Sequence, residues 1–260
     1  MLSYELEELY NKLNKREFVH PDPLEFLYVY PDRLDKEIVG LIASSLAYGR
    51  VNQILKSVKI VLDLMKPSPY DFIRYSNYEK WEYLFQSFKH RFTKGNDVVN
   101  LFIGIRKILS KHVSLENAFK SKLNINDENV IPALIGFIDE LNHLSKTNLG
   151  HLIPSPTKGS ACKRLMLFLR WMIRKDEVDL GCWSISSSKL LIPLDSHMFD
   201  ISRKLGFTDS KSTNLKTVIR ITNEFKKISV DDPVKYDFVL TRLGIRNELS
   251  KNDFIDRVTG

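Results

Sequence analysis

Two residues in this sequence have types and positions that suit covalent chemistry on a cationic intermediate. Lys163 opens an apolar helix pattern in PTKGSACKRLMLFLRWM (156–172), and Asp195 precedes a second pattern in IPLDSHMFDISRKLG. A lysine in the first turn meets the positive end of the helix dipole, which favours the neutral amine of a Schiff-base nucleophile. An aspartate held at a helix N-cap can stabilise a developing cation or accept a proton. The pair therefore suggests a nucleophile with an acid–base partner.

A simpler interpretation of both residues stays open. Long basic side chains at the ends of core helices commonly extend into solvent without a further role. An aspartate before a helix is explained by capping alone. Lys163 and Asp195 could therefore both be structural.

The helix that begins near Lys163 also has features that suit an anion. Lys163, Arg170 and Arg174 fall on one stripe at the helical period, which predicts a basic face. Gly159 allows a close backbone approach, and the first N–H groups of a helix can hold an anion. Together these features suggest contacts with phosphate groups.

The composition is that of a globular protein with a basic surface. The chain has 260 residues, a net charge of +7 and a pI near 9.2, which weakly favours a polyanionic partner. Cys162 and Cys182 cannot supply a four-ligand metal site by themselves, and they indicate no disulfide framework. No apolar run is long enough for a membrane span, and the first residues do not resemble a signal peptide, so we expect a cytoplasmic protein.

The elements that must position these residues are helices. Apolar residues recur at helical spacing along most of the chain, while alternating strand patterns are nearly absent, so the predicted fold class is all-α. Gly49 interrupts one long helical pattern, and Asp232-Pro233 suits the start of another. The polar segment 175–193 is the clearest loop. The expected helices are 3–16, two between 35 and 65 that are separated near Gly49, 70–75, 78–88, 97–111, 114–120, 128–144, 160–174, 196–205, 214–228, 232–243 and 250–257.

Several motifs together resemble a known superfamily. Pro193, Asp195 and His197 match the Pro-x-Asp-x-His segment of oxoguanine DNA glycosylases, and the glycine–lysine-helix–loop order before them also matches. With DKEIVGLIASSLAYGRVNQI, GSACKRLMLFLRWM and YDFVLTRLGI, the chain resembles a little-characterised prokaryotic family within the helix-hairpin-helix (HhH-GPD) superfamily of base-excision DNA glycosylases. The spacing from Lys163 to Asp195 is similar to that of the archaeal oxoguanine glycosylases.

The resemblance implies a fold of two helical lobes with the active site in a cleft between them. One lobe would combine residues 1–34 with 195–260, and the other would be 35–194, carrying a hairpin-like element at 149–174. The usual hairpin motif is degenerate here, because only Pro154 and Gly159 fit it. That leaves a hairpin-bound monovalent cation doubtful. The four-cysteine iron–sulfur signature of one branch is absent, so we expect no cofactor and no metal.

The resemblance also implies a role for other residues. AYGRVN lies where relatives insert a side chain into the gap left by a flipped base, with Tyr48, Arg50 and Asn52 as candidates; a helix kink with a surface arginine is the alternative. Trp183, in the loop, is a candidate for stacking on the extruded base, and His197 for contact with substrate. The remaining expected DNA contacts are Lys158, Gly159, Ser160, Arg170 and Arg174.

The sequence thus predicts a DNA glycosylase with AP-lyase activity. Lys163 would be its nucleophile and Asp195 would stabilise the cationic sugar. Its partner would be double-stranded DNA containing a damaged base, with an oxidised purine as the expected lesion class, and the protein would be a monomer associated with the nucleoid. One alternative is a DNA-structure-binding protein that has kept the fold and lost the chemistry. Another is a helical bundle that uses its basic face for contacts with proteins.

Overall fold

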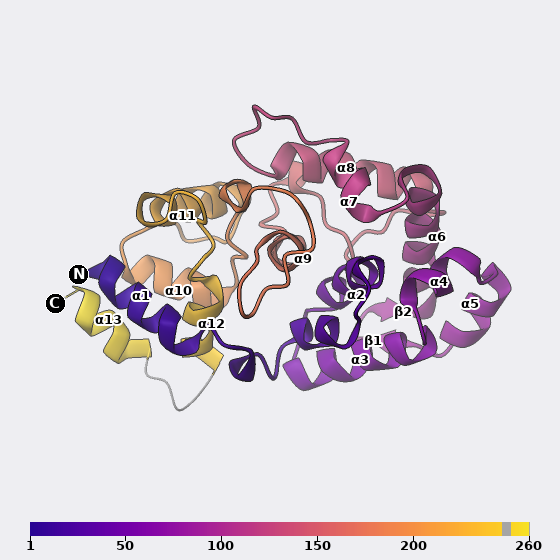
Figure 1. Cartoon of the computed structure of the whole chain (residues 1–260), viewed down its shortest axis with the longest axis horizontal. Coiled ribbons are helices and arrows are strands. Elements are labelled where there is room, and N and C mark those ends of the chain that lie inside the picture. The colour runs from indigo at the N-terminus through magenta and orange to yellow at the C-terminus, as the bar shows by residue number, and fades with distance from the viewer. Residues whose placement is uncertain (246–250, 260) are drawn as a thin grey trace. The chain divides into compact units, whose positions relative to one another are not determined.

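The computed structural model describes residues 1–245 and 251–259 and is predominantly helical, which confirms the all-α fold class. One short antiparallel hairpin and several 3₁₀ turns accompany the helices in this part of the chain (Figure 1). The helices are α1 (Leu2–Leu13), α2 (Arg33–Ser45), α3 (Val51–Leu64), α4 (Pro69–Tyr75), α5 (Tyr78–Phe85), α6 (Gly95–His112), α7 (Leu115–Lys120), α8 (Ile131–Leu144), α9 (Lys163–Ile173), α10 (Ser196–Lys204), α11 (Leu215–Ile228), α12 (Asp237–Ile245) and α13 (Lys251–Thr259). The hairpin strands are β1 (Lys89–His90) and β2 (Thr93–Lys94), and the 3₁₀ turns are η1 (Arg16–Phe18), η2 (Pro23–Val29), η3 (Pro156–Lys158) and η4 (Ser187–Lys189).

The C-terminal helices differ from their expected boundaries at one start, and a second start is not described. The helix expected from Asp232 begins instead at Asp237, because residues 233–236 form turns and the Asp232 carboxylate accepts a hydrogen bond from Arg174 Nε at 2.7 Å. The Asp232 carboxylate is thus paired with Arg174, the C-cap residue of α9. The expected start of the last helix at Ser250 lies outside the described residues.

The chain divides into two compact units, one made of residues 1–19 with 156–260 and the other of residues 20–155. This division differs from the expected boundary between residues 194 and 195. The segment 156–194, which contains α9, folds with the terminal helices because its apolar and charged side chains are buried there. Lys163 and Asp195 therefore belong to the same unit.

In the first unit, the N-terminal helix joins the C-terminal part of the chain. Helix α1 packs against α12 and α13, and α10 packs against α12 (Figure 1). Leu6, Leu9 and Leu13 recur along α1 at helical spacing and are buried. Their burial explains how a segment far away in sequence packs onto α12 and α13. None of the described helices of either unit is long and apolar enough to cross a membrane.

In the second unit, α6 is the central helix. It packs against α4, α5, α7 and α8, and Phe102, Ile105 and Leu109 on it are buried. The break predicted at Gly49 is present between α2 and α3, where Gly49 has a φ of 103° that residues with a Cβ rarely adopt. The chain can therefore turn sharply there.

Glu140 on α8 gathers three cationic side chains of the second unit. Its carboxylate lies 2.6 Å from Lys111 Nζ, 2.9 Å from His112 Nε2 and 2.9 Å from Lys122 Nζ. Burial opposes ionisation of Glu140, but hydrogen bonds from these three residues outweigh it and lower its pKa to about 2. The cluster ties α6 and the segment after α7 to α8.

This cluster predicts a specific acid sensitivity. A carboxyl whose pKa is lower in the folded than in the unfolded protein stabilises the fold above its unfolded pKa, and that stabilisation is lost as the pH falls toward its folded pKa. We expect Glu140→Gln to lower the urea midpoint at neutral pH, and the difference from wild type to shrink between about pH 4.5 and 2. The exposed Glu128→Gln should leave the midpoint unchanged. A constant difference at all pH values would contradict the ion-pair explanation.

Candidate active site around Lys163 and Asp195

The start of α9 is shaped by the residues before it. Gly159 has a φ of 75°, and its carbonyl accepts a hydrogen bond from Leu215 N at 3.0 Å, so the segment pairs with the start of α11. Ser160 forms an isolated bridge with Asn214. Cys162, buried and with a φ of 45°, then turns the chain into α9, of which Lys163 is the first residue. The exposed Lys158 lies in η3 just before this turn.

The element before α9 is a 3₁₀ turn and an extended pairing rather than a second helix. The described chain between α8 and α9 contains turns, η3 and the bridge at Ser160. The expected hairpin-like element at 149–174 thus consists of turns, η3 and α9. The anchored turn nevertheless fixes the direction in which Lys163 leaves the backbone.

Lys163 and Asp195 meet within the first unit. Lys163 Nζ lies 3.6 Å from Asp195 Oδ2, and the side chains are 37% and 18% exposed. Asp195 is the N-cap of α10, where its Oδ1 accepts a hydrogen bond from Met198 N at 2.8 Å. One carboxylate oxygen is thus used by the helix, and the other faces the amine. Capping and pairing occur together at this aspartate.

The distance in this pair sets a condition on any substrate. Two atoms 3.6 Å apart are already in contact, so a sugar cannot sit between them without moving one. The cap bond holds Asp195, whereas Lys163 has a flexible four-carbon stem that is partly exposed. A bound group would therefore displace the lysine and keep the aspartate in place.

His197, in the first turn of α10, packs against α12. A Cβ on Gly244 would overlap its imidazole ring, so a glycine is required opposite this histidine. Gly244 is the penultimate residue of α12. The imidazole is half-buried, and helix packing accounts for its position close to Asp195.

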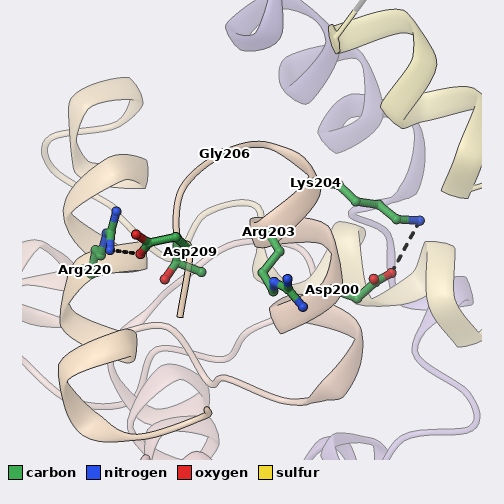
Figure 2. Close-up of a pocket in the computed structure, with 7 residues that line it drawn as sticks. Asp200, Arg203, Lys204, Gly206, Asp209 and Arg220 are labelled. Carbon is green, nitrogen blue, oxygen red and sulfur yellow. Dashed lines mark hydrogen bonds and ion pairs between the residues drawn. The ribbon is translucent and has the colours of Figure 1, made fainter. Parts of the chain in front are cut away.

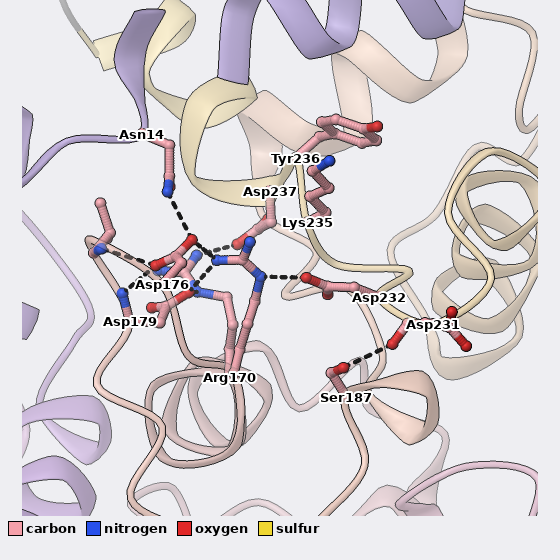
Figure 3. Close-up of polar contacts among 12 residues, drawn as sticks. Asn14, Arg170, Asp176, Asp179, Ser187, Asp231, Asp232, Lys235, Tyr236 and Asp237 are labelled. Atoms are coloured by element: carbon pink, nitrogen blue, oxygen red, sulfur yellow. Dashed lines mark hydrogen bonds and ion pairs between the residues drawn. The ribbon is translucent and has the colours of Figure 1, made fainter. Parts of the chain in front are cut away.

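The expected basic stripe of Arg170 and Arg174 does not face solvent. Each of the two residues is 3% exposed, and their guanidinium groups lie in a buried network of four carboxylates (Figure 3). Arg170 pairs with Asp237 and, at 3.2 Å, with Asp179. The expectation that these arginines bind DNA is wrong for the folded chain, because their charges are already matched in the interior.

Arg174 extends this network toward the N-terminal helix. It pairs with Asp176, lies 3.1 Å from Asp179 and 2.7 Å from Asp232, and donates a hydrogen bond to Tyr10 Oη at 3.0 Å. Burial opposes its charge, but the surrounding carboxylates raise its pKa above the usual range. Burial also raises the pKa of Tyr10 to about 12. The network therefore joins α1, α9 and the loop after α9.

Asp237 links this network to the Lys163–Asp195 pair. Its carboxyl is fully buried, which raises its pKa, and the negative charge of Asp195 adds to that effect while Arg170 opposes it. The two carboxylates therefore interact electrostatically. No motif in the sequence identified Asp237 as a neighbour of Asp195, since 42 residues separate the two.

The loop 175–193 is packed, and Trp183 is part of the core. Trp183 is 3% exposed, its ring meets Phe168 edge-to-face at 5.2 Å, and its backbone N–H donates to the Met172 carbonyl at 2.7 Å. Ser187 Oγ also donates to the Asp231 carbonyl (Figure 3). An extruded base cannot stack on an indole ring that is buried in the core, so the expected role of Trp183 is wrong for this conformation.

The AYGRVN residues lie in the second unit, apart from the lysine and aspartate in sequence. Arg50 is the N-cap residue of α3 and is exposed, as is Asn52. A surface hollow of about 420 Å³ is lined by residues 50–53. Tyr48 is held by its hydroxyl, which donates to the His90 carbonyl at 2.9 Å. The structure thus keeps Arg50 and Asn52 available to a partner and fixes Tyr48 against the hairpin.

A larger hollow of about 600 Å³ lies at the C-terminal end of α10 (Figure 2). It includes the ion pairs of Asp200 with Lys204 at 3.6 Å and of Asp209 with Arg220. Neither Lys163 nor Asp195 lines it. Cations at the end of a helix compensate its negative pole, which accounts for this arrangement without a ligand.

The described residues contain no grouped set of metal-ligating side chains. Within residues 1–245 and 251–259, no three His, Cys, Asp or Glu side chains are grouped so that they could hold a metal ion. Neither cysteine forms a disulfide bond.

No curated protein and no solved structure matches the chain. A family model described as a protein of unknown function, DUF2400, matches residues 22–246. Because this match covers most of the sequence, the chain belongs to the DUF2400 family.

Proposed function

We propose that this protein is a DNA glycosylase with AP-lyase activity. The observation that carries the proposal is the approach of Lys163 Nζ to within 3.6 Å of a carboxylate fixed at a helix N-terminus. An amine beside a positioned acid–base group is the arrangement that imine-forming nucleophiles use. The resemblance of the segments around both residues to HhH-GPD glycosylases supports DNA as the substrate.

The chemistry would begin at the anomeric carbon of a damaged nucleotide. That carbon is inaccessible in stacked duplex DNA, so the nucleotide would be extruded before reaction. Lys163 would transfer a proton to Asp195 and attack C1′ as a neutral amine. The glycosidic bond would break, and the departing base would take the bonding electron pair together with the proton that Asp195 received from Lys163. The carboxylate that Asp195 regenerates in this way would stabilise the positive charge that develops on the sugar.

The same lysine would then support strand cleavage. Opening of the sugar ring would leave an imine between Nζ and C1′, with O4′ protonated as a hydroxyl. The protonated imine acidifies the C2′ hydrogens. Loss of a C2′ proton would expel the 3′-phosphate by β-elimination, and hydrolysis would release the lysine. Apart from the water that hydrolyses the imine, each step uses groups that this chain or the DNA supplies.

Reductive trapping tests the proposal directly. We expect borohydride, added during reaction with one member of a panel of duplexes carrying oxidised, alkylated, deaminated or abasic sites, to reduce the imine and leave a covalent protein–DNA adduct on a denaturing gel. An oxidised purine is the expected substrate. Base release without an adduct would mean a glycosylase that lacks lyase activity. Binding without base release on any duplex would favour the DNA-structure-binding alternative.

A further inference from the structure

The hairpin of the second unit carries a tip that projects from a buried base. In its register His90 pairs with Thr93, so Arg91 and Phe92 form a two-residue turn. Both paired residues are fully buried, whereas the Phe92 side chain is 61% exposed. Arg91 has a φ of 54°, which residues other than glycine rarely adopt. The turn therefore holds an aromatic ring in solvent at some conformational cost.

Polar contacts beneath the tip keep it in place. Tyr48 Oη donates to the His90 carbonyl at 2.9 Å and shares a hydrogen bond with Thr93 Oγ1 at 2.6 Å. Thr93 Oγ1 also lies 2.6 Å from His151 Nε2. The His90 ring contacts Ser57 Oγ at 2.9 Å, which ties the hairpin to α3. β1 and α3 are neighbours in the fold (Figure 1). The hairpin is thus anchored on both strands.

The exposed ring is part of a stack. Phe92 lies parallel to Tyr48, with ring centroids 5.4 Å apart and an interplanar angle of 9°. The Arg91 guanidinium lies 5.2 Å from the Phe92 centroid and 5.8 Å from the Tyr48 centroid. His151 meets Phe92 edge-on at 5.7 Å. Because its neighbours already fix the ring, a partner that stacks on it loses little additional side-chain freedom on binding.

Unmatched positive charge surrounds this stack. Lys89, Arg91 and Lys94 are exposed on the hairpin, which has no acidic residue, and Arg50 follows the glycine over which the Arg91 side chain lies. Within the described chain none of these four cations forms an ion pair. Many other surface lysines do, as Lys111 does with Glu140. The hairpin therefore offers exposed cations that form no ion pair within the described residues, although the Asp97 carboxylate accepts a hydrogen bond from Lys94 N.

We propose that these residues form a platform for single-stranded DNA: Phe92 stacks on an unpaired base, and Lys89, Arg91, Lys94 and Arg50 bind the flanking phosphates. Aromatic rings set in a basic surface are the common means of binding single strands without reading their sequence. The inference rests on the proposed function for the choice of DNA, and it is independent of the chemistry at Lys163. It places a nucleic-acid contact in the unit that lacks the lysine–aspartate pair.

The test measures binding of the full-length protein to a fluorescent, undamaged oligothymidylate of about 16 nucleotides, the upper end of common single-strand site sizes. Fluorescence anisotropy should show Phe92→Ala weakening binding roughly 5- to 150-fold, as removal of one stacking ring does. Phe92→Trp should retain the affinity. Tyr4→Ala is the matched control, because Tyr4 is an aromatic residue of the other unit that is 66% exposed. Circular dichroism verifies that each variant is folded.

The salt dependence gives a second, independent measurement. Replacing Lys89 and Lys94 with glutamine should lower the slope of log affinity against log salt by roughly 0.7 for each phosphate that the protein no longer neutralises. Equal affinities of wild type and Phe92→Ala would overturn the proposal, as would an unchanged slope in the lysine variant. This oligonucleotide carries no lesion, so the two measurements do not depend on the chemistry at Lys163. Absence of lesion trapping together with binding that depends on Phe92 would therefore contradict the proposed function alone.

Discussion

Lys163→Gln is expected to abolish the borohydride-trapped adduct while the protein remains folded and still binds DNA. Glutamine has a helix propensity similar to that of lysine, so the first turn of α9 should persist. The amide cannot form an imine, so no covalent bond to C1′ can be reduced. The measurement is the trapped fraction at saturating concentrations of the cognate lesion duplex, with circular dichroism to confirm folding.

Lys158→Gln is the matched control for this variant. Lys158 is exposed in η3, five residues before Lys163, and carries the same charge. Its replacement should leave the trapped fraction at saturation unchanged, although more DNA is needed to reach it. Trapping that survives in Lys163→Gln and disappears in Lys158→Gln would identify the other lysine as the nucleophile.

Asp195→Asn separates chemistry from structure at the same site. Asparagine caps helices about as well as aspartate, so the bond to Met198 N and the start of α10 should be preserved. Without the carboxylate, proton transfer and stabilisation of the cationic sugar are lost, and single-turnover base release should slow by roughly 10²- to 10⁴-fold. A variant with unchanged rates would reduce Asp195 to a helix cap.

Arg170→Met is expected to lower the free energy of unfolding substantially. Methionine replaces much of the volume of the side chain but leaves Asp179 and Asp237 buried without this partner. Removing one member of a buried ion pair typically costs about 3–5 kcal/mol, because the remaining charge is stranded. The free energy of unfolding, measured by urea titration, should fall by this amount. Arg203→Met, at an exposed position of α10, should change it little.

The double variant Arg170→Met/Asp237→Asn tests the cause. It removes one stranded carboxylate, so part of the lost stability should return, and the coupling between the two sites should be evident in a double-mutant cycle.

The stability deficit of Arg170→Met should also depend on pH. Burial already raises the pKa of Asp237, and loss of Arg170 would raise it further. A carboxyl with a raised folded pKa destabilises the fold as the pH rises, so the deficit of Arg170→Met should be larger at about pH 8 than at about pH 5. A deficit independent of pH, with no rescue, would indicate poorer packing instead.

Local sequence patterns determined most of the secondary structure of this protein. Helical spacing of apolar residues predicted nearly every α-helix, since each such face must be buried and burial fixes the period. The break at Gly49 followed from a glycine inside a helical pattern, and the glycine adopts a positive φ there. The N-cap role of Asp195 was predicted from one side chain and the helix pattern after it. These features depend on interactions within a few residues.

The hairpin of residues 89–94 and the burial of Trp183 were not predictable in the same way. Two-residue strands are too short to show an alternating pattern, and a positive φ at Arg91 has no sequence signal. Trp183 stands in a polar, serine-rich segment, yet Phe168 and the backbone of α9 cover it. Contacts with other elements decided the environment of both.

The tertiary structure also decided which charges are available. Helical spacing predicted that Arg170 and Arg174 share one face, and the structure places Arg170 in α9 and Arg174 at its C-cap. A helical period cannot tell which neighbour that face meets. Aspartates up to 67 residues away neutralise them in the interior. Lys163, on the first turn of the same helix, instead remains partly exposed beside Asp195. The sequence by itself determined the types of these residues and their helices. Only long-range packing, which removes some charges from water and leaves others in contact with it, determined which of them can act on a substrate.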